Sequence, residues 1–353
     1  MAASHNIQPD LALLQAYLDK QAVEIGRLVS IEKFSGGQSN PTFKLCSDQG
    51  EFVLRRQPLG KLLKSAHAVD REFRIISALH NSKVPVPSAV HLCNDTQVIG
   101  SQFCIMSFVK GSIYWDAALP TFDELYGTEQ AKVSRTEIYD QMNLALTKLH
   151  QLNPQDLGLA DYGKPGNYFS RQLDRWTKQY IASKTEDNKD ADSLMKWLSN
   201  NIPDDDGKIS IVHGDFRLDN FVFDSSCHQM IAILDWELST LGHPYADLAY
   251  QCMQLRLPSN MGNVPGLGSI ERGALGIPSE AEYVARYCKR MDLDMIPNWK
   301  FYIAFSFFRL FSIVQGVVKR AKDGNASNAK ALELEALLKP LSTLALTALK
   351  EKD

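Results

Sequence analysis

The change in residue periodicity along the chain is the strongest constraint on its fold. Short β-prone runs separated by turn residues fill residues 31–55, and two more such runs follow at 89–93 and 102–108. From about residue 111 onward, apolar residues mostly recur at the spacing of amphipathic helices. One β-prone stretch, residues 209–235, interrupts this helical part. The pattern predicts an α+β fold with a small β-rich lobe and a larger, mostly helical lobe.

Helical patterns also occur in the first part of the chain. Apolar residues recur at helical spacing within residues 11–28 and 68–80, on either side of the first β-prone runs. We therefore expect one lobe over residues 1–108, containing an opening helix, a sheet and one further helix, and a helical lobe over residues 109–353. A chain of 353 residues has the length of two such units.

The composition excludes several classes of protein. Hydrophobic residues make up 44% and charged residues 22%, as in ordinary globular chains, and a net charge of −3 gives no reason to expect a nucleic-acid partner. None of the six cysteines forms a C-x-x-C pair, which argues against a zinc knuckle and predicts reduced thiols in a cytoplasmic protein. Residues 1–10 lack the pattern of a signal peptide.

Residues 301–318 form the most membrane-like run of the sequence. Its length approaches the roughly 18 residues that a membrane-spanning helix needs. Polar residues nevertheless recur at every third position of this run, at Ser306, Arg309, Ser312 and Gln315. Because a charge at the centre of a span is costly, we expect a buried helix with one polar stripe and no membrane insertion.

Two polar clusters follow two apolar runs in the β-prone stretch 209–235. The first run leads into His213-Gly214-Asp215 and, five residues further on, Asn220; the second leads into Asp235-Trp236-Glu237. Oxygen-bearing side chains such as Asp215, Asn220 and Asp235 are the type that Mg²⁺ takes together with substrate phosphates and water. We expect both clusters to lie at strand ends that face a ligand site.

This arrangement resembles the catalytic core of the kinase-like superfamily, H-x-D-x-x-x-x-N followed by an apolar hairpin and a second Asp. The H-G-D and D-W-E forms, with the run 240–250 (TLGHPYADLAY), are similar to the aminoglycoside phosphotransferase and choline kinase branch. The resemblance covers about residues 30–320. It implies a bilobal protein-kinase-like fold and an ATP- and Mg²⁺-dependent kinase that transfers the γ-phosphoryl group to a hydroxyl of a small molecule.

The resemblance also implies roles for individual residues. Asp215 is expected to be the base that accepts the proton of the attacking hydroxyl, while Asn220 and Asp235 are expected to be catalytic residues that hold Mg²⁺. His213 is expected to support the loop structurally, with a proton shuttle as the alternative. Asp247 is expected to brace the loop backbone. Glu237 is left open between a surface residue and a contact to substrate or metal.

The nucleotide is expected to bind the first lobe. Arg55 occupies the strand position where the wider family has a lysine, and Glu72 fits the helix glutamate that pairs with it; a surface salt-bridge residue is the alternative for Glu72. The turn of residues 35–40, which contains two glycines, is expected to bring backbone amides to the phosphates. The alternative is an ordinary hairpin turn. The remaining nucleotide-binding candidates are the turn residues Ser35, Gly36, Gly37, Gln38, Ser39 and Asn40 and the inter-lobe residues Met106, Ser107 and Phe108.

The acceptor side is expected to include residues 166–180, where Arg171, Arg175 and Lys178 share one helical face. A solvated face is the alternative. With residues 241–244 and Phe308-Arg309, this helix resembles the subgroup fused to acyl-CoA dehydrogenases, which implies a hydroxyacyl-CoA or hydroxy acid as acceptor. A basic face suits a CoA phosphate, and the Gly- and Pro-rich segment 258–278 is expected to be a mobile cover over an extended ligand.

Two other functions remain open from the sequence. One is an aminoglycoside or amino-alcohol (choline-like) kinase. The other is a pseudokinase that binds nucleotide and acts by contact with partners; the intact Asp215, Asn220 and Asp235 speak against it, while Arg55 in place of the lysine favours it. The sequence also leaves open the oligomeric state and the choice between ATP and GTP.

Overall fold

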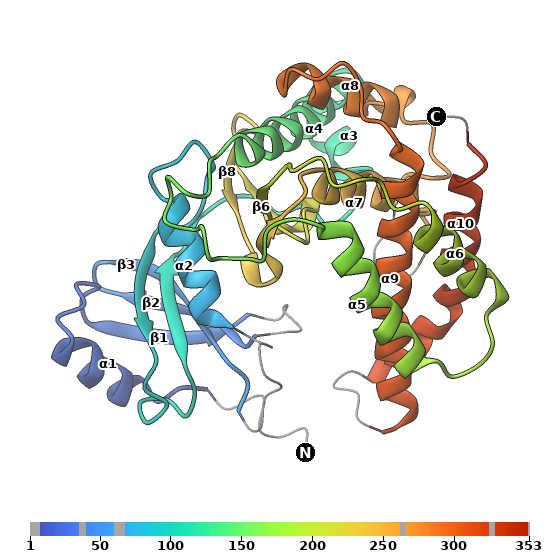
Figure 1. Cartoon of the computed structure of the whole chain (residues 1–353). Helices are drawn as coiled ribbons and strands as arrows, with labels where there is room; N and C mark the ends of the chain where they lie inside the picture. The colour runs from blue at the N-terminus through green and yellow to red at the C-terminus, as the bar shows by residue number, and fades with distance from the viewer. Residues whose placement is uncertain (1–7, 35–39, 60–67, 262–265, 325–328, 352–353) are drawn as a thin grey trace.

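The chain folds into a sheet-containing lobe and a larger helical lobe, as the computed structural model shows (Figure 1). The structure describes residues 8–34, 40–59, 68–261, 266–324 and 329–351. The last strand of the sheet ends at Ser107 and the next helix begins at Thr121, so the predicted lobe boundary falls in the segment between them.

The first lobe is built on a five-stranded antiparallel sheet of order β1-β2-β3-β5-β4. Asp10 caps the opening helix by accepting hydrogen bonds from the amides of Ala12 (2.8 Å) and Leu13 (3.0 Å). That helix is shorter than the predicted 11–28, because Gln21 ends it. The elements are α1 (Leu11–Lys20), β1 (Leu28–Lys33), β2 (Thr42–Ser47), β3 (Gly50–Arg56), α2 (Val69–Leu79), β4 (Ala89–Cys93) and β5 (Phe103–Ser107).

Strand β5 is buried on both faces because each face of the sheet is covered by a helix. Side chains alternate along a strand, so Phe103 and Ile105 face the core formed with α1. Cys104 and Met106 face the opposite way and pack with Val69 of α2. This sandwich fixes β3 and α2, the two elements that carry Arg55 and Glu72.

The second lobe consists of helices around two short β-hairpin-like pairs. Strand β6 pairs with β9, and β7 pairs with β8, both antiparallel. The strands are β6 (Ser210–Val212), β7 (Phe221–Phe223), β8 (Met230–Ile233) and β9 (Thr240–Gly242). The helices are α3 (Thr121–Tyr126), α4 (Thr128–His150), α5 (Tyr168–Ser183), α6 (Lys189–Asn200), α7 (Tyr245–Arg256), α8 (Glu280–Arg290), α9 (Trp299–Lys322) and α10 (Leu338–Ala348).

Helix α9 is the one helix in the described part of the chain that is long and apolar enough to cross a membrane. The mean hydropathy of its most apolar 18-residue window is 1.7, and 83% of that window is buried inside the fold. It packs between α5, α7 and α10 (Figure 1). Burial in the helical core therefore accounts for its apolar composition.

The segment 258–278 is packed where the structure describes it. The amide of Gly268 donates to the carbonyl of Leu257 (2.9 Å), and a side-chain nitrogen of Arg272 donates to the carbonyl of Leu255 (2.6 Å). Leu267 and Ile277 are buried. The prediction of a mobile cover is therefore wrong for these residues, which pack against α4 and α7 instead.

Candidate active site

The loop between β6 and β7 presents Asp215 and Asn220 and is held from α7. Both oxygens of the buried Asp247 carboxylate accept backbone hydrogen bonds, one from His213 (2.6 Å) and one from Gly214 (2.8 Å). Burial alone would raise the pKa of Asp247, but His150 and the loop amides outweigh it, so this pKa lies below its usual value. Asp247 thus braces the loop as a buried carboxylate.

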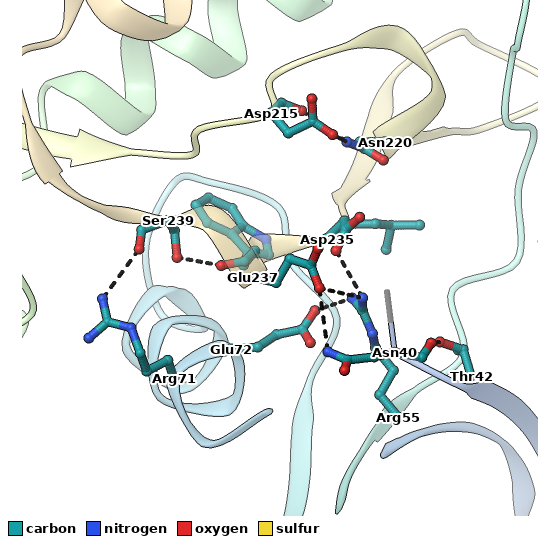
Figure 2. Close-up of polar contacts among 12 residues, drawn as sticks. Asn40, Thr42, Arg55, Arg71, Glu72, Asp215, Asn220, Asp235, Glu237 and Ser239 are labelled. Atoms are coloured by element: carbon teal, nitrogen blue, oxygen red, sulfur yellow. Dashed lines mark hydrogen bonds and ion pairs between the residues drawn. The ribbon is translucent and has the colours of Figure 1, made fainter. Parts of the chain in front are cut away.

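Asp215 and Asn220 contact each other directly (Figure 2). The side-chain amide of Asn220 donates to the backbone oxygen of Asp215 (2.9 Å) and to its carboxylate (3.1 Å). Because the nitrogen of this amide faces Asp215, its oxygen is the atom left for a cation.

His213 links the catalytic loop to the end of β8. Its Nε2 donates to the carbonyl of Leu234 (2.9 Å), and its Nδ1 accepts from the amide of Asp215 (3.2 Å). The ring is fully buried. Both nitrogens are used in these structural contacts, which favours the structural role over a proton shuttle.

Arg55, at the end of β3, lies among three carboxylates (Figure 2). Its guanidinium nitrogens are 2.5 Å from Glu72 of α2, 2.9 Å from Asp235 and 3.7 Å from Glu237. Asp235 has a left-handed backbone (φ +62°), which is uncommon for a residue with a side chain. The structure therefore joins the predicted strand cation, the helix glutamate and the second Asp of the motif in one group.

The charges of this group fit a divalent cation. One guanidinium faces three carboxylates, which leaves an excess of negative charge when all are ionised. Burial, together with Asp235 and Glu237, raises the pKa of Glu72 to about 7, although Arg55 opposes the rise. Among the described residues no group of three or more His, Cys, Asp or Glu side chains could hold a metal alone. Asn220 and Asp235 carry oxygen atoms of the kind that Mg²⁺ takes together with nucleotide phosphates.

Glu237 is the residue on which the sequence left the question open. The side-chain amide of Asn40, which is 1% exposed, donates to Glu237 (3.4 Å), so Glu237 connects the two lobes beside Arg55. Trp236 between the two acidic residues is 1% exposed and packs into the core. The available sequence signal was the tryptophan between two acidic residues, a pattern which indicates that both acidic side chains could point to the same site.

The other nucleotide-binding candidates are placed in part. Residues 35–39 lie outside the described residues. Met106 lies in β5. The amide of Ser107 donates to the carbonyl of Ser88 (2.9 Å), and the amide of Phe108 donates to the carbonyl of Glu51 (3.1 Å). The amides of Ser107 and Phe108 are therefore already used within the protein.

The three basic residues of α5 each have a different local contact. Arg171 donates to the carbonyls of Lys164 and Pro165, which lie in the segment just before its own helix. Lys178 forms an exposed ion pair with Asp174 (2.7 Å). The guanidinium of Arg175 lies 5.0 Å from the ring centre of Trp176. Helical spacing places the three residues on one face, but Arg171 and Lys178 are engaged by local polar partners.

Comparison with known sequences identifies relatives over most of the chain. Residues 30–268 match the phosphotransferase enzyme family APH. The chain is 43% identical over 313 residues to acyl-CoA dehydrogenase family member 10 of Mus musculus, covering 89% of this chain and 28% of that protein. It is 38% identical over 338 residues to family member 11 of Homo sapiens, covering 94% and 42%. The chain thus spans less than half the length of these curated relatives.

Solved structures have the same fold. A candidate aminoglycoside phosphotransferase from Ralstonia eutropha has a TM-score of 0.86 at 43% identity, covering 98% of this chain and 100% of that one. A mutant of aminoglycoside phosphotransferase APH(4)-Ia, in complex with ADP and hygromycin B, has a TM-score of 0.60 at 12% identity, covering 96% and 99%. The kinase-like bilobal fold expected from the sequence is confirmed.

Proposed function

The chain belongs to the APH phosphotransferase enzyme family, and we propose that it transfers the γ-phosphoryl group of ATP, in the presence of Mg²⁺, to a hydroxyl of a small anionic molecule. The observation that carries this proposal is the placement of the Asp215–Asn220 loop together with the Arg55, Glu72 and Asp235 group (Figure 2). In the proposed reaction these residues would supply the base, the phosphate-binding cation and the metal-binding oxygens.

The chain's own residues would act by orientation and proton transfer. Asp215 accepts the proton of the acceptor hydroxyl. The hydroxyl oxygen bonds to the γ-phosphorus while the bond between this phosphorus and ADP breaks. Arg55 binds nucleotide phosphate and is oriented by Glu72. Asn220 and Asp235 would hold Mg²⁺, which supplies charge neutralisation for the phosphates when it is bound.

A hydroxyacyl-CoA or hydroxy acid is the acceptor that we favour. The curated relatives are named as acyl-CoA dehydrogenase family members, which suggests chemistry on acyl thioesters. Arg175 is held by a ring contact, and the structure shows no carboxylate partner for it among the described residues. Two acidic residues close to the start of α5 are already engaged: Asp205 accepts from the amide of Asn167, and Asp206 pairs with Lys208 and His243. A polycationic acceptor needs free carboxylates.

The alternative acceptor is an aminoglycoside, and it has its own observation. The APH(4)-Ia neighbour is a complex with hygromycin B. Its identity to this chain is 12%, so the likeness extends to the fold and leaves the acceptor open.

We place the reaction in the cytoplasm. All six cysteines are free thiols in the structure, four of them buried, which suits a reducing compartment.

An ATP-consumption screen over 4-hydroxyacyl-CoAs, free 4-hydroxy acids, aminoglycosides and choline-like alcohols tests the proposal. We expect Mg²⁺-dependent ADP release with a hydroxyacyl-CoA or hydroxy acid, and none with Asp215→Asn. Transfer to kanamycin with no response to the anionic acceptors would restore the aminoglycoside function.

A further inference from the structure

Arg309 is a charged residue on α9, the most apolar helix of the chain. Its side chain is half-buried. A cation in such surroundings loses water and is stable only where hydrogen bonds or ring faces replace that water. Three contacts do so here, and the strongest of them reaches the catalytic loop from a position 95 residues away in the sequence.

A terminal nitrogen of Arg309 donates to the carbonyl oxygen of Gly214 (2.5 Å), the residue directly before Asp215. This carbonyl and the amide of Asp215 belong to one planar peptide group. The amide end of that peptide donates to Nδ1 of His213 (3.2 Å). The peptide that leads into Asp215 is therefore held at both ends, by Arg309 at its oxygen and by His213 at its nitrogen.

The preceding peptide is held separately. Its amide, the N–H of Gly214, donates to Asp247 (2.8 Å). Gly214 has φ +85°, and a Cβ there would lie 2.7 Å from the carbonyl oxygen of Leu238. Asp247 thus fixes the peptide between His213 and Gly214. The orientation of the peptide between Gly214 and Asp215 depends on other groups.

Two aromatic rings fix the guanidinium of Arg309. It lies 4.7 Å from the ring centre of Tyr250 and 5.7 Å from that of Trp176, and these rings are only 5% and 8% exposed. Burial and, to a smaller extent, the charge of Asp215 raise the pKa of the Tyr250 phenol to about 12, although Arg309 opposes the rise.

We infer that Arg309 is a positioning residue for Asp215, acting through the Gly214 carbonyl. The inference rests on the proposed role of Asp215 as the base. Small displacements of a reacting group slow the chemical step more than they weaken binding. The loss of Arg309 therefore acts on kcat and leaves the ATP KM unchanged.

The first test compares Arg309→Met and Arg309→Lys with Arg320→Met, an exposed arginine on the same helix. We expect Arg309→Met to lower kcat per folded enzyme by about tenfold or more, the scale of one charge-assisted hydrogen bond. Lysine can still donate to the carbonyl and restores part of kcat, while Arg320→Met has wild-type kinetics. Equal kcat in Arg309→Met and Arg320→Met would overturn the inference, as would an increase in ATP KM with kcat unchanged.

The second test needs no acceptor. Hydrogen exchange of peptides covering residues 211–220 should be faster in Arg309→Met than in the wild type or Arg320→Met. Unchanged exchange in this loop would overturn the inference. A wrong choice of acceptor gives a different result. The wild type would then show no turnover with the hydroxylated anions, but the difference in hydrogen exchange would persist.

Discussion

Replacing Arg55 with methionine is the most informative perturbation of the nucleotide side. Arg55 is 12% exposed and contacts Glu72 at 2.5 Å and Asp235 at 2.9 Å. Methionine keeps much of the length of the side chain but carries no charge. The change therefore removes the cation from a group of three carboxylates and leaves the strand itself in place.

The expected loss follows from these contacts. One charge-assisted hydrogen bond contributes about 1.5–3 kcal/mol, which corresponds to roughly 10–150-fold in kcat/KM for ATP. Without Arg55, the carboxylates of Glu72, Asp235 and Glu237 also repel the ATP phosphates, which acts in the same direction. We expect kcat/KM for ATP to fall by at least about tenfold.

Steady-state kinetics with ATP varied at saturating acceptor measures this loss. Arg56→Met is the matched control, because Arg56 is the next residue of the strand, is 1% exposed and donates to the carbonyl of Ile99. It should lower the melting temperature but leave the ATP kinetics of the folded enzyme near wild type. Unchanged ATP kinetics in Arg55→Met would refute the assignment of Arg55 as the phosphate-binding cation.

Four further results are expected. Asp215→Asn should lower transfer by about 10²–10⁴-fold, measured as phosphorylated product, while Mg-ATP still binds in calorimetry. Gly214→Ala should destabilise the fold by about 1–3 kcal/mol in urea unfolding, because its φ is positive and Leu238 blocks a Cβ; equal stability would contradict this. The pKa of Glu72 is raised to about 7, so its contribution to stability is lost as pH rises through that value; the wild type should lose melting temperature relative to Glu72→Gln between about pH 5 and pH 8, and a parallel dependence would exclude this shift. Arg175→Ala should raise the acceptor KM, whereas Lys178→Ala, which removes an exposed ion pair, should not.

Much of the site could be predicted because its parts are local in the sequence. Asp215 and Asn220 belong to one short loop, which leads into β7. Asp235 follows β8, the strand that pairs with β7, so their spacing in the sequence brings these residues near each other. Arg55 and Glu72 are 17 residues apart, and their contact was expected from the resemblance to kinase-like proteins, in which a strand cation pairs with a helix glutamate.

The rest depended on contacts that periodicity does not encode. Helical spacing placed Lys178 on a basic face, but its partner Asp174 lies one turn away on the same helix and takes the charge. The contact of Arg309 with the Gly214 carbonyl depends on how α9 packs beside α5 and α7, and the sequence shows only a polar stripe. The packing of residues 266–278 likewise comes from hydrogen bonds to α7 and its C-terminal end, which the Gly and Pro content did not reveal.

The central claim is that this chain phosphorylates a hydroxyl of an anionic small molecule with Asp215 as the base. Its most direct test is mass spectrometry of a 4-hydroxyacyl-CoA after incubation with Mg²⁺ and ATP labelled with ¹⁸O in the γ-phosphoryl group, for the wild type and Asp215→Asn. The account predicts that the wild type transfers the labelled phosphoryl group to the acyl hydroxyl and that the variant does not. Label found only in inorganic phosphate, or equal labelling of the acceptor by the variant, would contradict it.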